Sequence, residues 1–167
     1  DAASVRCSIV VRAGSSDGLR KGLAVTAAGA LVGTVHEAGI WHSRVRLITD
    51  GESRIPCRVQ RTRDLCVLEG TGGTNCTVEW VGRNSGLRDG DVLVTAPVDA
   101  VLSEPATVPP GIPAATVTAT RAGRTRPLFQ EVTARPRVET SRLETVEIIV
   151  PNAGYRQKGS PEDDESP

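Results

Sequence analysis

Short runs of branched aliphatic residues recur along the chain, and each ends at a break of Gly, Asp, Ser or Pro. Breaks at a spacing of roughly 8–12 residues are typical of β-sandwiches and barrels. No stretch keeps a helical period with caps at both ends, so we expect little helix. The pattern predicts strands over residues 7–12, 23–27, 30–36, 40–49, 55–61, 65–69, 76–81, 92–95, 114–119, 128–134 and 146–150.

Polar and apolar residues alternate in two of these runs, residues 43–48 and 56–61, which predicts strands with one face in water. Residues 144–150 alternate first and then become wholly apolar, as expected of a strand that closes the fold. The chain after Pro151 is rich in Gly, Ser, Pro and acidic residues. Such a segment cannot bury enough apolar area to offset its ordering entropy, so we expect a disordered acidic tail over 151–167.

A glycine-bounded motif occurs twice. Gly18-Leu19-Arg20-Lys21-Gly22 precedes one predicted strand, and Gly86-Leu87-Arg88-Asp89-Gly90 precedes another. Glycines at this spacing also arise by chance before strands, because glycine tolerates positive φ. We interpret the echo as a duplication and predict an all-β fold of two small tandem β-barrel subdomains, over 1–70 and 71–135. Closing strands over 136–150 follow, and their return to the first subdomain is left open.

Composition narrows the range of possible functions. Lys+Arg and Asp+Glu are equal at 20 each, so no global field attracts nucleic acid or an anionic membrane. Aromatic residues make up only 2%, which leaves the core to Val, Leu, Ile and Ala. No apolar run approaches the ~20 residues of a membrane-spanning helix, and the first residues lack a signal-peptide pattern. Because the chain starts almost inside a strand, we expect that an upstream part has been removed.

The cysteines Cys7, Cys57, Cys66 and Cys76 form no C-x-x-C pair. Neither His36 nor His42 sits at zinc-finger spacing from them, so we expect no metal and no cofactor. Four cysteines allow three disulfide pairings, or each is a buried small apolar residue. The second interpretation is favoured, because three of the four lie within β-like runs.

Catalytic patterns are weak. His42 and Asp50 could be two members of a chymotrypsin-like triad, but the serines near glycine, Ser15, Ser16 and Ser85, are explained by turns. The Gly70-Thr71-Gly72-Gly73 stretch lacks the Lys-Ser/Thr and the helix of a P-loop. The chymotrypsin-like hydrolase is therefore the second alternative function.

The sequence Gly86-Leu87-Arg88-Asp89-Gly90-Asp91-Val92-Leu93 resembles the turn and strand of PDZ domains, which bind a C-terminal peptide as an added strand. No helical pattern follows where the PDZ groove needs one. A PDZ-like peptide-binding module is the first alternative.

Taken in order, seven segments resemble the periplasmic region of the rod shape-determining MreC family. They span nearly all of the chain up to Val150 and lie at residues 18–25, 29–35, 43–50, 66–72, 87–95, 109–113 and 143–148. Two departures concern loops: Thr95-Ala96-Pro97 replaces the family's Thr-Ser-Gly, and the loop before Pro109 is enlarged by residues 103–107. The membrane helix and coiled coil that precede this region in the family are absent from this sequence.

The resemblance implies a non-catalytic scaffold of the bacterial cell-wall elongation complex, on the periplasmic side of the cytoplasmic membrane. It implies an elongation-specific transpeptidase and an MreD-type membrane protein as partners, and a homodimer or self-assembly in the full-length protein. Contact with the membrane would come only through the upstream anchor, and nucleic acid is not expected. As contact residues we predict Ile40, Trp41, Val98, Val101, Leu102 and Ile112.

Several residues are assigned to structure. Trp80 follows Val78 by two, so alternation predicts it as a core anchor. Trp41 is either an exposed hot spot or a ring packed across a barrel mouth. Structural turns are predicted at Gly18, Gly22, Gly33, Gly86, Gly90, Asp91 and Gly111.

Overall fold

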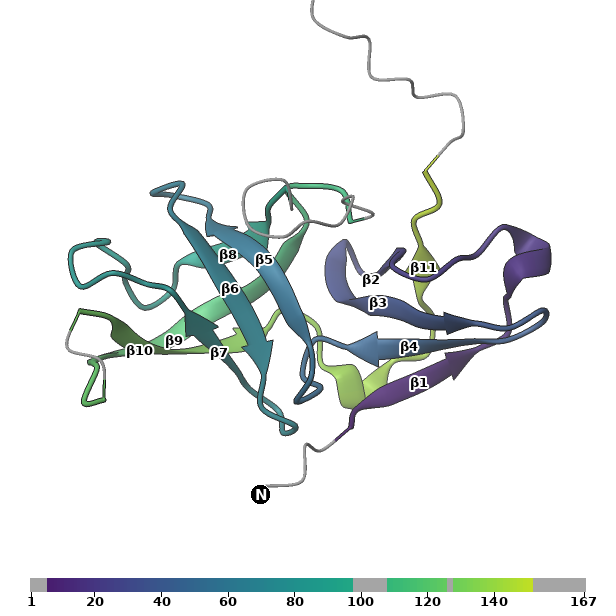
Figure 1. Cartoon of the computed structure of the whole chain (residues 1–167), viewed down its shortest axis with the longest axis horizontal. Helices are drawn as coiled ribbons and strands as arrows, with labels where there is room; N and C mark the ends of the chain where they lie inside the picture. The colour runs from purple at the N-terminus through teal and green to yellow at the C-terminus, as the bar shows by residue number, and fades with distance from the viewer. Residues whose placement is uncertain (1–5, 98–107, 126–127, 152–167) are drawn as a thin grey trace, which may run out of the picture.

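The fold consists of an open five-stranded sheet and a closed six-stranded barrel that lie side by side (Figure 1). The structure is a computed structural model that describes residues 6–97, 108–125 and 128–151. Almost every regular element is a strand, and within those residues the helical elements are three-residue 3-10 turns. The predicted all-β class with little helix is confirmed.

The open sheet has the strand order β1-β4-β3-β2-β11, and all of its neighbours are antiparallel. The longest pairing is the β3–β4 hairpin, in which Val35 lies opposite Val45. The short helix η1 lies between β1 and β2. The bounds are β1 (Ser8–Val11), η1 (Ser15–Asp17), β2 (Ala24–Ala27), β3 (Ala30–Ala38), β4 (Ser43–Leu47) and β11 (Glu147–Ile148).

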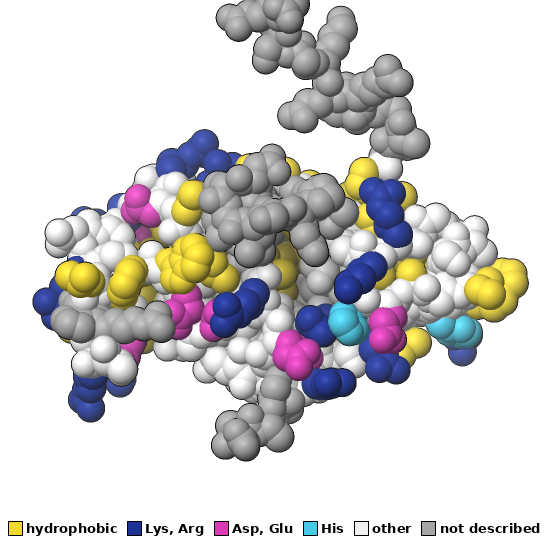
Figure 2. Space-filling view, in the orientation of Figure 1, with side chains coloured by type: hydrophobic (Ala, Val, Ile, Leu, Met, Phe, Trp, Pro, Cys, Tyr) yellow, Lys and Arg dark blue, Asp and Glu magenta, His cyan; other side chains and the backbone are white. Residues whose placement is uncertain are grey.

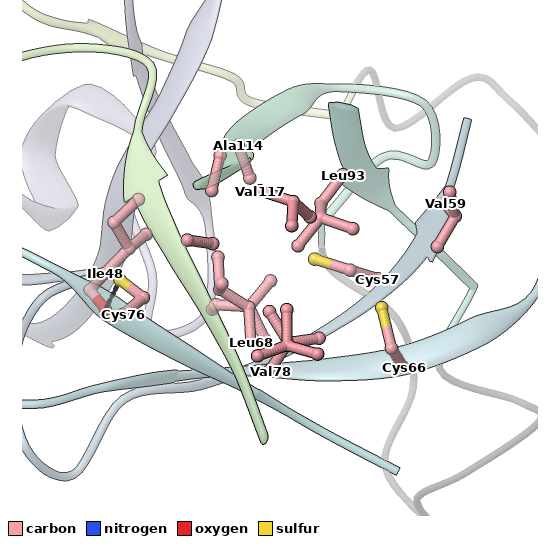
Figure 3. Packing of buried hydrophobic residues seen from close by; sticks show 14 of the residues in the cluster. Ile48, Cys57, Val59, Cys66, Leu68, Cys76, Val78, Leu93, Ala114 and Val117 are labelled. Carbon is pink, nitrogen blue, oxygen red and sulfur yellow. Dashed lines mark hydrogen bonds between the residues drawn. The ribbon is translucent and has the colours of Figure 1, made fainter. Parts of the chain in front are cut away.

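The barrel closes in the order β10-β7-β6-β5-β8-β9, with β9 pairing back onto β10. Its inward positions alternate along the strands and hold mainly Val, Leu, Ala and Cys, which fill the interior in Figure 3. The bounds are β5 (Arg54–Val59), β6 (Leu65–Gly70), β7 (Cys76–Glu79), β8 (Val92–Thr95), β9 (Pro113–Ala122) and β10 (Gln130–Pro136), and η3 (Thr140–Arg142) follows.

The two units share one core. Ala24, Leu31 and Ile48 come from the open-sheet half, yet they pack in the same buried cluster as the barrel interior. Figure 3 shows Ile48 beside Cys76, whose thiol donates a hydrogen bond to the Ile48 carbonyl at 3.5 Å. The joint between the units is therefore packed like an interior.

The strands change sheet after β4, and this differs from the predicted boundary at residue 70. β5 and β6 pair inside the barrel because the link between Leu47 and Arg54 turns the chain away from the open sheet. The closing segment carries β11, which pairs with β2 at the end of the open sheet opposite β1. Apart from Pro151 itself, the tail predicted over 151–167 lies outside the described residues.

Two residue predictions are wrong. Trp80 is 57% exposed, because its positive φ of 68° breaks the alternation that pointed it inward. Gly33 lies inside β3 rather than in a turn; a Cβ there would come within 2.1 Å of the Arg46 carbonyl oxygen, so glycine permits a close approach of β3 and β4. The prediction of buried free thiols is confirmed for Cys57, Cys66 and Cys76, whereas Cys7 is a half-buried free thiol.

Candidate functional site

The end of the β3–β4 hairpin carries two adjacent apolar side chains in solvent. Ile40 is 63% exposed and Trp41 is 68% exposed, and both lie between the end of β3 and the start of β4. We call residues 39–42 the hairpin tip. Together the two side chains form a small exposed apolar patch.

The hairpin tip is held by the η1 turn. Ser15 and Ser16 donate backbone hydrogen bonds to the carbonyls of Gly39 and Ile40 at 2.8 and 3.2 Å, and the Ser16 hydroxyl donates to Ile40 at 2.7 Å. A Cβ at Gly14 would lie 2.3 Å from the Ile40 carbonyl oxygen, so glycine is needed for this approach. The tip is fixed before any partner arrives, which lowers the entropy cost of binding.

The other predicted contact residues lie elsewhere. Ile112 is half-buried against the barrel core, and its backbone N–H donates to the Thr95 hydroxyl at 2.9 Å. Ile112 directly precedes β9, and Figure 1 shows β9 in the barrel, away from the end of the β3–β4 hairpin, so Ile112 does not join Ile40 and Trp41 in one patch. Val98, Val101 and Leu102 lie outside the described residues.

The turn before β8 is organised by an ion pair. Arg61 binds both carboxylate oxygens of Asp91, at 2.9 and 2.7 Å, and also donates to the Gly86 carbonyl at 2.8 Å. The backbone N–H of Arg88 donates to Asp91 at 2.9 Å. The hydrogen bond from Arg61 lowers the pKa of Asp91, although partial burial opposes the shift. Asp91 therefore has a structural role, since it holds this turn together.

This geometry does not favour the PDZ-like alternative. The N–H groups of a PDZ carboxylate loop must be free to receive the peptide terminus. Here Leu87 donates to the Ser85 hydroxyl, Arg88 donates to Asp91, and Gly90 donates to the Val117 carbonyl. The described chain also contains no α-helix that could flank a peptide groove.

The residues considered for a triad are not assembled. Asp50 is buried and accepts hydrogen bonds from the backbone N–H groups of Cys7 and Glu52, at 2.6 and 2.8 Å. His42 is exposed at the hairpin tip, and β4, which spans roughly 15 Å, separates it from Asp50. Asp50 is a structural acceptor at the joint between the two units.

The cysteines are not arranged for nucleophilic or metal chemistry. Burial raises the pKa of Cys66 and of Cys76 to about 12 and raises that of Cys57 as well. A reactive cysteine needs the opposite shift, because the thiolate is the nucleophile. Across the described residues, no three His, Cys, Asp or Glu side chains are grouped as a metal site.

One apolar surface was missed by the sequence interpretation. Trp80 lines a hollow of about 350 Å³ together with Leu65, Val81 and Asn84. Leu65 is itself 47% exposed. This surface depends on the left-handed backbone of Trp80. The sequence carries no signal for it, because a positive φ at a residue other than glycine is uncommon and tryptophan does not favour one.

Among the helices that the described residues form, none has the length and apolar character required to cross a bilayer.

Comparison with known proteins gives a consistent result. The family model described as rod shape-determining protein MreC, barrel core, matches residues 1–150. The cell shape-determining protein MreC of Haemophilus influenzae is 30% identical over 148 residues, which cover 88% of this chain and 40% of that protein. The protein of the same name from Cereibacter sphaeroides is 35% identical over 91 residues, 54% of this chain and 30% of the relative. The chain thus spans well under half the length of these relatives.

Solved structures agree. The crystal structure of MreC from Pseudomonas aeruginosa superimposes with a TM-score of 0.77 at 27% identity, covering 90% of this chain and 93% of that one. A structure of the major periplasmic domain from the cell shape-determining filament MreC gives a TM-score of 0.64 at 23% identity, covering 84% and 83%. The second likeness concerns the fold alone.

Proposed function

The chain belongs to the MreC family of rod shape-determining proteins, and from this premise we propose that it is a scaffold of the cell-wall elongation complex. The family is one of cell shape-determining proteins and not of enzymes. The scaffold maintains cell shape by holding peptidoglycan synthases and membrane partners together. The single observation that carries the proposal is the family match over residues 1–150.

The proposed location is the periplasmic side of the cytoplasmic membrane. In support, one structure of similar fold is a periplasmic domain of a filament-forming MreC. The proposed partners are the elongation-specific transpeptidase and an MreD-type membrane protein, and the full-length protein forms a homodimer or a larger self-assembly.

We place one partner contact at the hairpin tip. Tryptophan is enriched among binding hot spots, and its large face loses little entropy when the backbone beneath it is already fixed. Ile40 and Trp41 present such a face, held by hydrogen bonds from Ser15 and Ser16. Val98, Val101, Leu102 and Ile112 are proposed as a separate contact.

The test measures binding of the purified chain to the transpeptidase ectodomain and to detergent-solubilised MreD by surface plasmon resonance. Trp41→Ala should weaken binding roughly thirtyfold if the ring is a hot spot. Trp80→Ala is the matched control, since it removes another exposed ring, from the barrel half, and should leave binding unchanged. Both variants should unfold within about 0.5 kcal/mol of the wild type.

The two parts of the proposal fail separately. Wild-type affinity in Trp41→Ala would remove the hairpin tip while leaving the scaffold function. If neither partner binds the wild-type chain, the scaffold function itself is wrong.

A further inference from the structure

The outer edge of β1 is an unpaired strand edge. The backbone N–H of Leu47 donates to the Cys7 carbonyl, which sets the phase of the β1–β4 ladder. In an antiparallel pair the residues alternate between bonding the neighbour and pointing away from it. The N–H and C=O groups of Ser8 and Val10 therefore point away from β4, and no other described strand pairs with them.

No other edge in the described fold is comparable. The barrel is closed and so offers no edge of its own. At the opposite end of the open sheet, β11 contains only two residues and is followed by Pro151, which cannot donate to a ladder. β1 offers four residues of regular strand.

Side chains on the outward face of β1 are apolar at the centre and basic around it. Val10 is 66% exposed, whereas its neighbours Ile9 and Val11 pack against the core of the open sheet. Arg44 lies directly opposite Val10 on β4. Arg12 is exposed at the bend that follows β1, two residues beyond Val10.

The arginines on this face have few acidic partners. Arg12 and Arg44 form no ion pair with any described residue, although Glu37 lies opposite Arg44 on β3. Arg6 is 78% exposed and only 4.0 Å from Glu52. Glu52 is shared with Arg46, which it meets at 3.2 Å. Figure 2 shows basic side chains over both halves of the molecule, with acidic side chains and histidines among them over the open-sheet half.

We propose that the outer edge of β1 is a docking site for an extended acidic segment of a partner protein, which joins the open sheet as an added strand. The backbone of the segment pairs with Ser8 and Val10, an aliphatic side chain covers Val10, and acidic side chains two positions away meet the arginines. The fitting pattern is acidic-x-aliphatic-x-acidic. This site is independent of the hairpin tip and does not rest on the proposed function.

A strand fits this edge better than a lipid surface does. Anionic headgroups could neutralise the arginines, but they cannot form the regular ladder that Ser8 and Val10 leave open. The arginines also disfavour a second copy of β1, because antiparallel pairing of two such edges would bring like charges together.

The test uses a fluorescein-labelled, end-blocked peptide with the core Glu-Thr-Val-Thr-Glu, titrated with the chain by fluorescence anisotropy. Arg12→Glu and Arg44→Glu should each weaken binding roughly fivefold. The double variant should instead prefer the peptide with Lys in place of Glu. Arg121→Glu, an exposed arginine of β9 in the barrel, is the matched control and should bind as the wild type.

Two further probes test the backbone contact. Val10→Pro removes the outward N–H and spares the β1–β4 ladder, so it should abolish binding while circular dichroism and Tm stay close to the wild type. A peptide N-methylated at alternate residues should not bind. The proposal is overturned if the N-methylated peptide binds as well as the parent, if charge reversal fails to switch peptide preference, or if the chain binds anionic phosphatidylglycerol vesicles and not the peptide.

Discussion

The same glycine-bounded turn opens a strand in both halves of the molecule, and its two copies are built alike. Gly18, Gly22, Gly86 and Gly90 all have positive φ. Gly22 and Gly90 donate to the carbonyls of Val35 and Val117, both at 2.8 Å. Leu19 and Leu87 are equally buried at 7% exposure. The shared backbone bonding supports the duplication that the sequence echo indicated.

The residue that follows the second glycine differs between the copies. Leu23 is fully buried in the core of the open sheet, whereas Asp91 is held by Arg61 at the end of the barrel. The carbonyls of both residues accept the same hydrogen bond, from Val35 and from Val117. The backbone hydrogen bonds of the turn are thus the same whichever side chain follows the second glycine. In the small open sheet this side chain adds apolar area to the core, whereas the barrel, whose interior is already filled, accommodates an ion pair at its end.

Closure is the second difference between the halves. β8 pairs with both β5 and β9 and so completes the barrel, whereas β2 pairs with β3 and the two-residue β11. The barrel therefore has no free edge, and the open sheet keeps β1 exposed. Surfaces for strand addition belong to the open half.

The largest expected effect comes from the core that the halves share. Leu31 is fully buried and reaches from β3 into the barrel cluster. Leu31→Ala should cost about 2–5 kcal/mol of the free energy of unfolding, because it leaves a cavity. Urea unfolding followed by Trp41 in a Trp80→Phe background, and by Trp80 in a Trp41→Phe background, should show coincident losses. A shift in the Trp41 signal alone would mean that the halves unfold separately.

A somewhat smaller effect is expected at the joint. A Cβ at Gly70 would meet the Asp50 carbonyl oxygen at 2.0 Å, where the end of β6 contacts the link between the halves. Gly70→Ala should destabilise the protein by about 1–3 kcal/mol through overpacking. Gly82→Ala is the control, since nothing lies within 4 Å of its Cβ position. Equal Tm values for the two variants would contradict the close contact.

The smallest effect concerns the ionic anchor. Asp91→Asn should cost about 1–2 kcal/mol at pH 7, a modest figure because Arg61 is half exposed. The folded-state pKa of Asp91 lies below its ordinary value, so its contribution is complete above about pH 4 and is lost as the pH falls through the lowered pKa. Chemical denaturation at pH 7 and in acid should show the two proteins converging in acid. A constant difference would exclude Asp91 as the titrating group.

Much of the fold could be predicted from local pattern. The strands were found near their true positions because alternation and glycine breaks are short-range signals, as in residues 54–59, where Ile55, Cys57 and Val59 face inward. The sheet change after β4 could not be predicted, since β5 looks the same whether it pairs with the first or the second unit. Trp80 was misplaced because alternation fails at a residue with positive φ.

The candidate contacts divide in the same way. The sequence allows Trp41 to be either exposed or packed across a barrel mouth. The structure shows it exposed, on a hairpin tip that hydrogen bonds from the η1 turn hold in place. The sequence alone gives no reason to group Arg12 with Arg44, because the two residues are far apart along the chain. Pairing of β1 with β4 is what brings them around Val10.

By itself the sequence determined the secondary-structure elements and the family. Strand periodicity, turn glycines and the order of the segments that resemble the family are all properties of residues close together in the chain. Tertiary structure decided which strands close into a barrel, which edge stays open and which charges gather, because these depend on pairing between residues distant in the chain. Local preference cannot specify such pairing when many strands have similar faces.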